Sequence, residues 1–299
     1  MGRPPPPTPR PTRRAVADVV RRALAEDRAG RDITSRALLP PGRRAWATLE
    51  AQADGVFSGA EVVRAVARAA DLTVHGLRPD GARVTAGSVV ACVSGPALGL
   101  LAVERSLLNL VMHLSGVATA TARAVAAAGP RLAVYATRKT LPGLRDLEKD
   151  AVRHGGGRTH RRDLSDALLV KGNHFALVPA SEALGRARAA ARRRRRRLEV
   201  EVGSIAEALA AARAGADAIL LDNLGPARAR RVVRALAAAG LRHRVWVEVS
   251  GGIGPQNIGR YRGVGADAAS LGALTHSATA VPFHLVVRPA GDAPRRRTA

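Results

Sequence analysis

The sequence predicts an α/β protein with a small mixed α+β domain followed by a closed or nearly closed β/α barrel. Residues 43–100 alternate short apolar runs with turns, whereas from residue 131 onward strand-like and helix-like runs alternate regularly. Strands and helices that alternate with short loops indicate a parallel sheet. Six strands in about 140 residues, without the glycine fingerprint of a dinucleotide-binding fold, favour a barrel.

The first part begins with a helix that Thr12 is predicted to cap, because Val16, Val19, Val20 and Leu24 follow at helical spacing. A polar loop is expected at 26–35. Further on, the strand-like runs are WATLEA, GVFSG, LTVHGL and GSVVACVSGP, with a helix at 59–70 and a turn at Pro79-Asp80-Gly81. A long helix is predicted at 103–128, with Gly116 as its break.

The second part is predicted from its alternation. Strands are expected at 131–136, 167–170, 198–202, 217–221, 245–249 and 268–271. Helices are expected between them at 143–154, 180–191, 204–214, 226–239 and 255–262. In the run LEVEV, alternation puts Glu199 and Glu201 on one face and the valines on the other. A buried carboxylate is costly without a partner, so both glutamates are expected to meet cations.

Polar residues follow or end almost every predicted barrel strand, where an α/β scaffold exposes its chemistry. A triple glycine, residues 155–157, also opens into His160 and Arg161. The strand-end residues are Arg138, Lys139, Lys171, Glu201, Asp222, Asn223, Ser250, Gly251, Gly252 and Gly272. So many cationic groups at one edge predict a site that holds several negative charges.

Lysine usage supports this site. The chain has 48 Lys and Arg, of which only Lys139, Lys149 and Lys171 are lysines. Two of the three end strands at the predicted site. Arginine and lysine are not interchangeable where a compact point charge is needed, so a function for these lysines is favoured over chance survival.

The carboxylates and glycines at the strand ends each allow two interpretations. Glu201 and Asp222 could form salt bridges to Lys139 or Lys171, or they could be oxygen ligands of Mg²⁺ held mainly through a phosphorylated substrate. Both can hold. The glycine-rich turns after the last two strands could cradle a phosphate with backbone N–H groups, or be tight connections.

Composition bounds the remaining possibilities. A net charge of +24 invites a nucleic-acid interpretation, but the arginines are scattered and aromatic residues make up only 2%. The run Arg192 to Arg197 is most simply a solvated helix end or loop. The single cysteine, Cys92, suggests a reducing compartment. No uninterrupted apolar run of about 18 residues is present, so no membrane span is expected.

These stretches together resemble the quinolinate phosphoribosyltransferase family, the decarboxylating enzymes that make nicotinate mononucleotide for NAD synthesis. The resemblance spans Glu26 to Ser277 in the family's order. It is carried by EDRAGRDITS, ERSLLNLVMHLSGVAT, TRKTLPGLRDLEKDAVRHGGGRTHR, LSDALLVKGNH, ADAILLDN, SGGI and LGALTHS. It implies an N-terminal open α/β sandwich, an incomplete α/β barrel, and a homodimer or higher homo-oligomer with sites shared between subunits.

The resemblance also implies roles for matching residues. Those expected to hold the two carboxylates of quinolinate are Arg105 (from the partner subunit), Arg138, His160, Arg161 and Lys171. Those expected around phosphoribosyl pyrophosphate and its Mg²⁺ are Lys139, Glu201 and Asp222, and Thr140 is expected among the substrate-binding residues. Those expected to receive the 5-phosphate are Ser250, Gly251, Gly252 and Gly272. Lys139, Lys171, Glu201 and Asp222 are the expected catalytic residues.

The chain departs from the family pattern at Gly172, where the family usually has an acid after the lysine. A rival of the same fold is a paralogue associated with molybdenum transport, but that group lacks a lysine at the position of Lys171. A rival of a different class is a basic nucleic-acid-binding protein, which has no use for the strand-end residues.

The predicted division of the chain has five segments. Residues 14–115 are the N-terminal sandwich, 116–275 the catalytic barrel, and 276–290 a C-terminal segment packing on the N-terminal domain. Residues 1–13 and 291–299 are expected to be disordered tails, the first rich in proline and arginine and without the apolar region of a signal peptide. A cytoplasmic enzyme with no membrane or nucleic-acid partner is expected.

Overall fold

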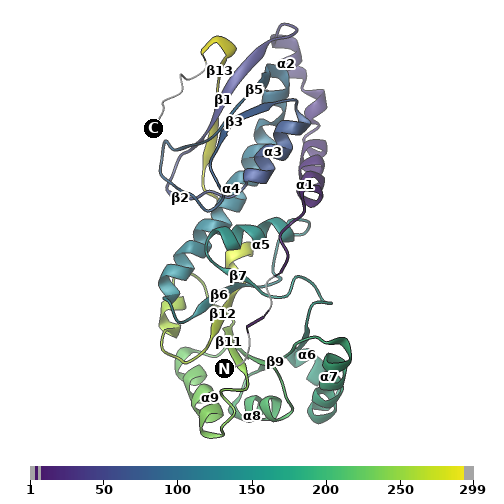
Figure 1. Cartoon of the computed structure of the whole chain (residues 1–299), viewed down its shortest axis with the longest axis vertical. Helices are drawn as coiled ribbons and strands as arrows, with labels where there is room; N and C mark the ends of the chain where they lie inside the picture. The colour runs from purple at the N-terminus through teal and green to yellow at the C-terminus, as the bar shows by residue number, and fades with distance from the viewer. Residues whose placement is uncertain (1–3, 6–7, 293–299) are drawn as a thin grey trace. The chain divides into compact units, whose positions relative to one another are not determined.

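The computed structural model describes residues 4–5 and 8–292 and divides the chain into two compact units (Figure 1). The N-terminal unit comprises Arg10–Ala122, Leu141–Gly156 and Ala278–Ala299. The barrel unit comprises Met1–Pro9, Arg123–Thr140 and Gly157–Ser277. Residues 1–3, 6–7 and 293–299 of the predicted tails lie outside the described residues. Within the described part, Thr8 Oγ1 lies 2.6 Å from Thr159 Oγ1, so this piece of the predicted tail contacts the barrel unit.

The N-terminal unit opens with helix α1 (Arg13–Glu26), capped as predicted by Thr12, whose hydroxyl accepts from the N–H of Ala15. Its buried face carries Val16, Val19 and Val20, the helically spaced valines of the sequence. The segment predicted as a loop at 26–35 is partly helical instead. A 3₁₀ turn (Ala29–Arg31) leads into α2 (Ile33–Leu38), because Asp32 caps the N–H groups of Thr34 and Ser35.

The sheet of this unit has the strand order β13-β1-β5-β3, with helices α1 and α3 on one side of it (Figure 1). All neighbouring strands are antiparallel, and β13, at the end of the described chain, pairs with β1 from Ala45↔Pro289 to Ala51↔Phe283. The C-terminal segment therefore supplies the edge strand of the first unit. Element bounds are β1 (Arg44–Ala51), β2 (Gly55–Val56), α3 (Ala60–Ala69), β3 (Thr73–Leu77), β4 (Arg83–Val84), β5 (Val89–Pro96) and β13 (Phe283–Pro289).

Helix α4 (Ala97–Ala128) runs without interruption through Gly116, so the predicted break there is wrong. A glycine is needed at position 116 because of packing: a Cβ there would lie 2.4 Å from the backbone oxygen of Thr279 and 3.0 Å from Ala280 Cα. The glycine permits a close backbone approach. Among the described helices, α4 alone is long and apolar enough to cross a membrane by length and composition, which is weak evidence because half of its most apolar stretch is buried.

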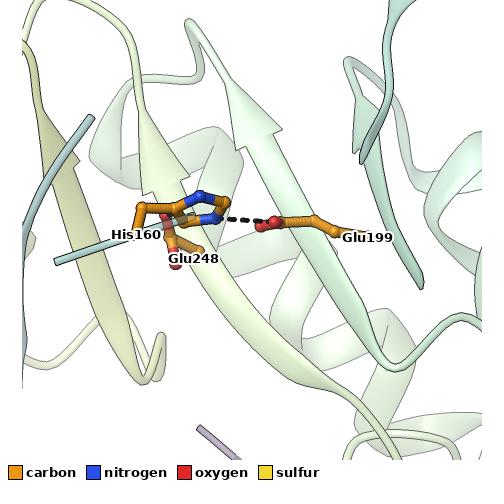
Figure 2. Close-up of side chains that lie close together, drawn as sticks. All are labelled: His160, Glu199 and Glu248. Atoms are coloured by element: carbon orange, nitrogen blue, oxygen red, sulfur yellow. Dashed lines mark hydrogen bonds and ion pairs between the residues drawn. The ribbon is translucent and has the colours of Figure 1, made fainter. Parts of the chain in front are cut away.

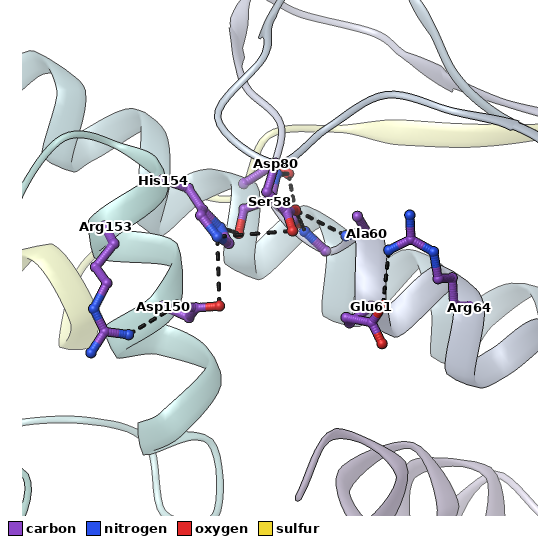
Figure 3. A network of polar contacts seen from close by, with 10 residues as sticks. Ser58, Ala60, Glu61, Arg64, Asp80, Asp150, Arg153 and His154 are labelled. Carbon is purple, nitrogen blue, oxygen red and sulfur yellow. Dashed lines mark hydrogen bonds and ion pairs between the residues drawn. The ribbon is translucent and has the colours of Figure 1, made fainter. Parts of the chain in front are cut away.

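Helix α5 (Arg145–His154) lies in the N-terminal unit, although the predicted barrel domain at 116–275 included it. A polar network holds it there (Figure 3). His154 Nδ1 lies 2.8 Å from Ser58 Oγ, and its Nε2 lies 3.5 Å from Asp150. Asp80 accepts from the N–H groups of Gly59 and Ala60 at the start of α3. Ser58 is buried, and Asp80 caps the start of α3.

The barrel unit is a parallel sheet of seven strands in the order β7-β6-β12-β11-β10-β9-β8. All its neighbouring pairs are parallel, and β7 and β8 end the order, so the barrel is incomplete. The strands are β6 (Ala133–Ala136), β7 (Arg158–Thr159), β8 (Leu168–Val170), β9 (Leu198–Val202), β10 (Ala218–Asp222), β11 (Trp246–Ser250) and β12 (Ala268–Leu271).

Helices α7 (Ala180–Arg194), α8 (Ile205–Arg213) and α9 (Pro226–Ala238) lie outside the strands (Figure 1). The apolar strand residues that face them, such as Val200 and Val202, are almost fully buried. The helix expected at 255–262 is only a 3₁₀ turn (Ile258–Tyr261). The alternating pattern did not predict the two-residue strand β7, the short helices α6 (Gly172–Phe175) and α10 (Ala273–His276), or β13.

Gly155 at the end of α5 offers a test of the N-terminal unit. A Cβ there would lie 2.2 Å from the backbone oxygen of Ala118 and 2.7 Å from Thr121 Cβ. Gly155→Ala should lower the free energy of unfolding by about 2 kcal/mol or more, because backbone atoms cannot move aside cheaply. Gly76→Ala in β3 of the same unit is the control, since a Cβ there meets nothing within 4 Å. Urea unfolding of both variants measures the difference, and equal stabilities would contradict the predicted clash.

Candidate active site

The carboxyl ends of the barrel strands surround a cavity of about 290 Å³. Eight of the residues predicted from the sequence line it: Arg138, Lys139, His160, Arg161, Lys171, Glu201, Asp222 and Ser250. Its other lining residues are Thr137, Leu169, Leu220, Glu248 and Ser270. Parallel strands all end at the same edge of a sheet, which is why residues far apart in the sequence meet here.

The end of β6 supplies two cations to the cavity. The N–H of Lys139 donates to Thr137 Oγ1 at 3.0 Å, which shapes the turn that carries both Arg138 and Lys139. Arg138 Nε is buried and has no hydrogen-bond partner among the described residues. A buried donor without an acceptor is costly, so the cavity is better suited to an anion than to an empty state. Thr140 does not line the cavity; its hydroxyl donates to the backbone oxygen of Arg138.

Lys171 and Glu201 form the closest ion pair in the cavity. Lys171 Nζ donates to Glu201 Oε2 at 2.6 Å, and the N–H of Gly172 lies 3.4 Å from Glu201 Oε1. The pair confirms the expectation that Glu201 meets a cation. Lys171 remains 45% exposed, so its ammonium is accessible from the cavity while it is paired. At Gly172 a Cβ would meet only Glu201 Oε1, at 4.0 Å, so an acid here would point towards another carboxylate.

The ends of β10 and β11 are joined through backbone contacts. Asp222 pairs in register with Ser250, and the N–H of Asn223 donates to the Ser250 backbone oxygen at 2.9 Å. Gly251 has φ of +93°, and a Cβ there would lie 2.2 Å from Asn223 Oδ1. Only glycine fits this turn. At Gly272 a Cβ would lie 2.9 Å from both Lys139 Cδ and His276 Nε2.

His160 reaches into the barrel, where Glu199 and Glu248 approach its ring (Figure 2). His160 Nε2 lies 2.7 Å from Glu199 Oε2 and 3.9 Å from Glu248 Oε1. Ser270 Oγ donates to Glu248 Oε1. His160 follows the short strand β7, and its N–H donates to the backbone oxygen of Ala136 at the end of β6 at 3.1 Å. The partner of Glu199 is thus a histidine, again a group that can carry positive charge.

Burial and neighbouring charges shift the pKa values of this group. Burial, together with the negative charge of Glu199, raises the pKa of Glu248 to about 7. Burial also acts to raise the pKa of Glu199, but His160 and Arg197 outweigh it and hold that pKa below its ordinary value. Burial and the neighbouring Arg138 lower the pKa of Arg161. The cavity therefore concentrates cations that would gain from an anionic ligand.

Glu248 and Ser270 were missed in the sequence. Glu248 sits in VWVEV, where a lone acid alternates with buried valines as Glu199 and Glu201 do in LEVEV. The same alternation would have identified it. Ser270 lies within the short run AASL, where serine carries no comparable signal.

Other predicted residues are not among those that line this cavity. Arg105 lies on α4 in the N-terminal unit and lines a different cavity with Arg22, Asp27 and Asn109. Gly251, Gly252 and Gly272 belong to the adjoining loops and are not among the lining residues. In the arginine run, Arg192 to Arg196 are exposed as expected, whereas Arg197 is half-buried. The interpretation of the whole run as solvated is wrong for Arg197, whose guanidinium acts on Glu199 and Glu248.

The raised pKa of Glu248 predicts a pH-dependent stability. The unfolded carboxyl ionises near its ordinary 4.5, but in the native state it keeps its proton to about pH 7. Its contribution to stability is therefore complete below pH 4.5 and is lost as the pH rises to about 7. Glu248→Gln should flatten the fall in unfolding free energy between pH 5 and 8, measured by urea titration. Glu199→Gln, which removes a paired carboxylate, should destabilise the protein across this range. An unchanged slope in Glu248→Gln would contradict the assignment.

Comparison with known proteins gives this geometry its context. The family models for the N-terminal and C-terminal domains of quinolinate phosphoribosyl transferase match residues 32–115 and 117–286. A probable nicotinate-nucleotide pyrophosphorylase (carboxylating) of Methanothermobacter thermautotrophicus is 40% identical over 279 residues, covering 91% of this chain and 99% of the relative. The Mycobacterium leprae nicotinate-nucleotide pyrophosphorylase (carboxylating) is 41% identical over 276 residues, covering 88% and 94%.

Solved structures agree with these sequence matches. The crystal structure of NadC from Streptococcus pyogenes superposes with a TM-score of 0.86 at 38% identity, covering 94% of this chain and 99% of that one. The nicotinate-nucleotide pyrophosphorylase from Francisella tularensis has a TM-score of 0.86 at 30% identity, covering 95% and 100%. The two domain matches, the full-length identity and the shared fold lead to one conclusion: the chain belongs to the quinolinate phosphoribosyltransferase family.

Proposed function

We propose that this protein transfers the phosphoribosyl group of phosphoribosyl pyrophosphate to quinolinate, with loss of CO₂, to form nicotinate mononucleotide. The observation that carries the proposal is the convergence of Arg138, Lys139, His160, Arg161 and Lys171 on one cavity that also contains the carboxylates Glu201 and Asp222. A dicarboxylate and a phosphorylated sugar pyrophosphate need such a density of positive charge. Relatives of similar length carry the name of this activity.

The acceptor site is built from Arg138, His160, Arg161 and Lys171. Guanidinium groups pair with carboxylates through two parallel hydrogen bonds, and the ammonium of Lys171 adds a compact charge. Arg105 lies in the N-terminal unit and would join this set from the partner subunit. The proposal therefore includes a homodimer whose sites are shared. A soluble enzyme acting in the cytoplasm fits the small-molecule substrates.

The phosphoribosyl pyrophosphate site adjoins it. Lys139, with Thr140 shaping its turn, would face the pyrophosphate, and the turns at 250–252 and Gly272 would receive the 5-phosphate through backbone N–H groups. Glu201 and Asp222 are hard oxygen donors at the strand ends, so they fit Mg²⁺ bound with the pyrophosphate. When bound, the ion would neutralise charge that develops on the departing pyrophosphate.

The reaction follows from positioning and electrostatics. The pyridine nitrogen of quinolinate forms a bond to C1 of the ribose as the bond from C1 to the pyrophosphate oxygen breaks. The ring is then a cationic electron sink. The bond from C2 to the adjacent carboxylate breaks, CO₂ leaves, and its electron pair stays on C2, which takes up a proton. The cations of the cavity hold the two carboxylates in place and favour the departure of pyrophosphate.

The decisive assay measures nicotinate mononucleotide formed from quinolinate and phosphoribosyl pyrophosphate with Mg²⁺. Product that depends on both substrates is expected, and its absence from folded protein would refute the proposal. Nicotinate in place of quinolinate is the control, since it lacks the carboxylate that leaves as CO₂.

Arg161→Ala tests the acceptor site. The guanidinium is half-buried and donates to the Ala167 backbone oxygen at 3.0 Å, which fixes its direction. Its loss should weaken quinolinate binding by about 10- to 100-fold, because a charge-assisted contact contributes about 1.5–3 kcal/mol. Calorimetry measures the affinity, and Arg193→Ala on the exposed end of α7 is the matched control. Equal affinities for the two variants would remove Arg161 from the site.

Lys171→Arg tests the need for a compact charge. The ammonium of Lys171 is 2.6 Å from Glu201, and a longer planar fork would not keep this geometry. Turnover should fall on the order of 10²-fold, as when one preorganised electrostatic contact is removed. Steady-state kinetics measures the loss, with thermal melting to check folding. Near-normal turnover would mean that charge alone suffices at this position.

A further inference from the structure

Glu199 and Glu248 form a buried group with His160. Of the three, only His160 has a part in the reaction described above. The two glutamates are 3% and 0% exposed and lie on β9 and β11. Glu199 Oε1 and Glu248 Oε2 are buried without a hydrogen-bond partner among the described residues. Two incompletely paired carboxylates in a protein interior are costly, so a stability role alone does not account for them.

The charges that face the two glutamates come from every element around them. Arg197, at the start of β9, acts on both, and Arg161 acts on Glu199. Tyr135 on β6 lies close enough to Glu248 to interact electrostatically, and Ser270 on β12 donates to it. His160 Nε2 is 2.7 Å from Glu199 but 3.9 Å from Glu248. The two carboxylates therefore differ in their distance from the imidazole: Glu199 is its hydrogen-bond partner, and Glu248 lies further away.

A metal ion is one occupant that such a group could take, since its candidate ligand atoms all lie within 4.8 Å of one another. The guanidinium groups of Arg161 and Arg197 already supply positive charge to the carboxylates, so a divalent cation would meet repulsion. A single proton shared unequally between the carboxylates fits better, because two buried acids in one site do not both ionise readily.

We propose that Glu199 and Glu248 are positioning residues that keep His160 as an imidazolium facing the acceptor cavity, Glu199 as the carboxylate that pairs with it and Glu248 as the neutral acid. In this state the group of His160, Glu199, Glu248 and Arg197 carries a net positive charge beside the cavity. Ionisation of Glu248 removes that net charge and weakens the hold on an anionic ligand. The identity of this ligand rests on the proposed function, whereas the charge state of His160 is independent of that function.

The first experiment uses the ligand-free full-length protein, so it does not depend on activity. In ¹⁵N-histidine NMR spectra, the His160 signal is identified by its loss in His160→Gln. At pH 7.5 the ring should be doubly protonated in the wild-type protein and in Glu248→Gln, but mainly neutral in Glu199→Gln. A neutral ring in the wild-type protein would overturn the proposal. A spectrum that changes on adding Zn²⁺, or on treating the purified protein with a chelator, would overturn it in favour of a metal site.

The second experiment measures quinolinate affinity by calorimetry between pH 6 and 8.5, where the carboxyl groups of the ligand stay ionised. Wild-type affinity should fall about tenfold across this range. This is the change expected when Glu248 ionises and its ionisation and ligand binding are coupled by about one pKa unit. Glu248→Gln should remove this fall and bind tightly at pH 8.5, whereas Glu199→Gln should bind weakly throughout. Parallel pH profiles for wild type and Glu248→Gln would refute the role of Glu248. If the NMR result is as expected but quinolinate does not bind, the proposed function is refuted and the charge state of His160 is not.

Discussion

The balance of charge at the carboxyl ends of the barrel strands is the constraint on which this structure depends. Five cationic or potentially cationic side chains share one cavity, and burial and Arg138 lower the pKa of Arg161 there. Such a cluster of cations is costly without nearby negative charge. Glu201 compensates Lys171, and Glu199 compensates His160. These two ion pairs hold Lys171 and His160 in place, while Arg138 Nε has no hydrogen-bond partner among the described residues.

The carboxylates differ in depth, and depth gives them different chemistry. In the strand register Glu201 is level with Leu220 and Glu248, while Glu199 is level with Ala218 and further from the strand ends. Glu201, near the edge, pairs with the partly exposed ammonium of Lys171. Glu199 and Glu248 are buried inside, where burial and the charge of Glu199 raise the pKa of Glu248, while His160 and Arg197 hold the pKa of Glu199 below its ordinary value. The carboxylate at the strand ends is thus paired with a partly exposed ammonium, whereas the two inside the barrel are closed off from solvent.

Backbone geometry imposes the second constraint. Gly251 brings main chain so close to Asn223 that any side chain would collide, and at Gly272 a Cβ would press on the side chains of Lys139 and His276. These approaches keep backbone N–H groups at the edge of the sheet, next to the cations. Contacts therefore explain Gly251 and Gly272, whereas Gly252 is explained only by its positive φ of +62°, a distinction that the sequence alone left open.

The sequence by itself determined the repeated strands and helices of the barrel, because hydrophobic periodicity reflects burial directly. It also determined most of the cavity's residues, since polar groups that directly follow apolar strands must lie at the sheet edge. It could not determine elements too short to have a period, such as β7, or the continuity of α4 through Gly116. Only the tertiary structure decided that Glu248 lies near His160, that Arg197 interacts with the buried glutamates, and that β13 is the edge strand of the first sheet. These depend on contacts between residues far apart in the chain, and local propensity carries no record of such contacts.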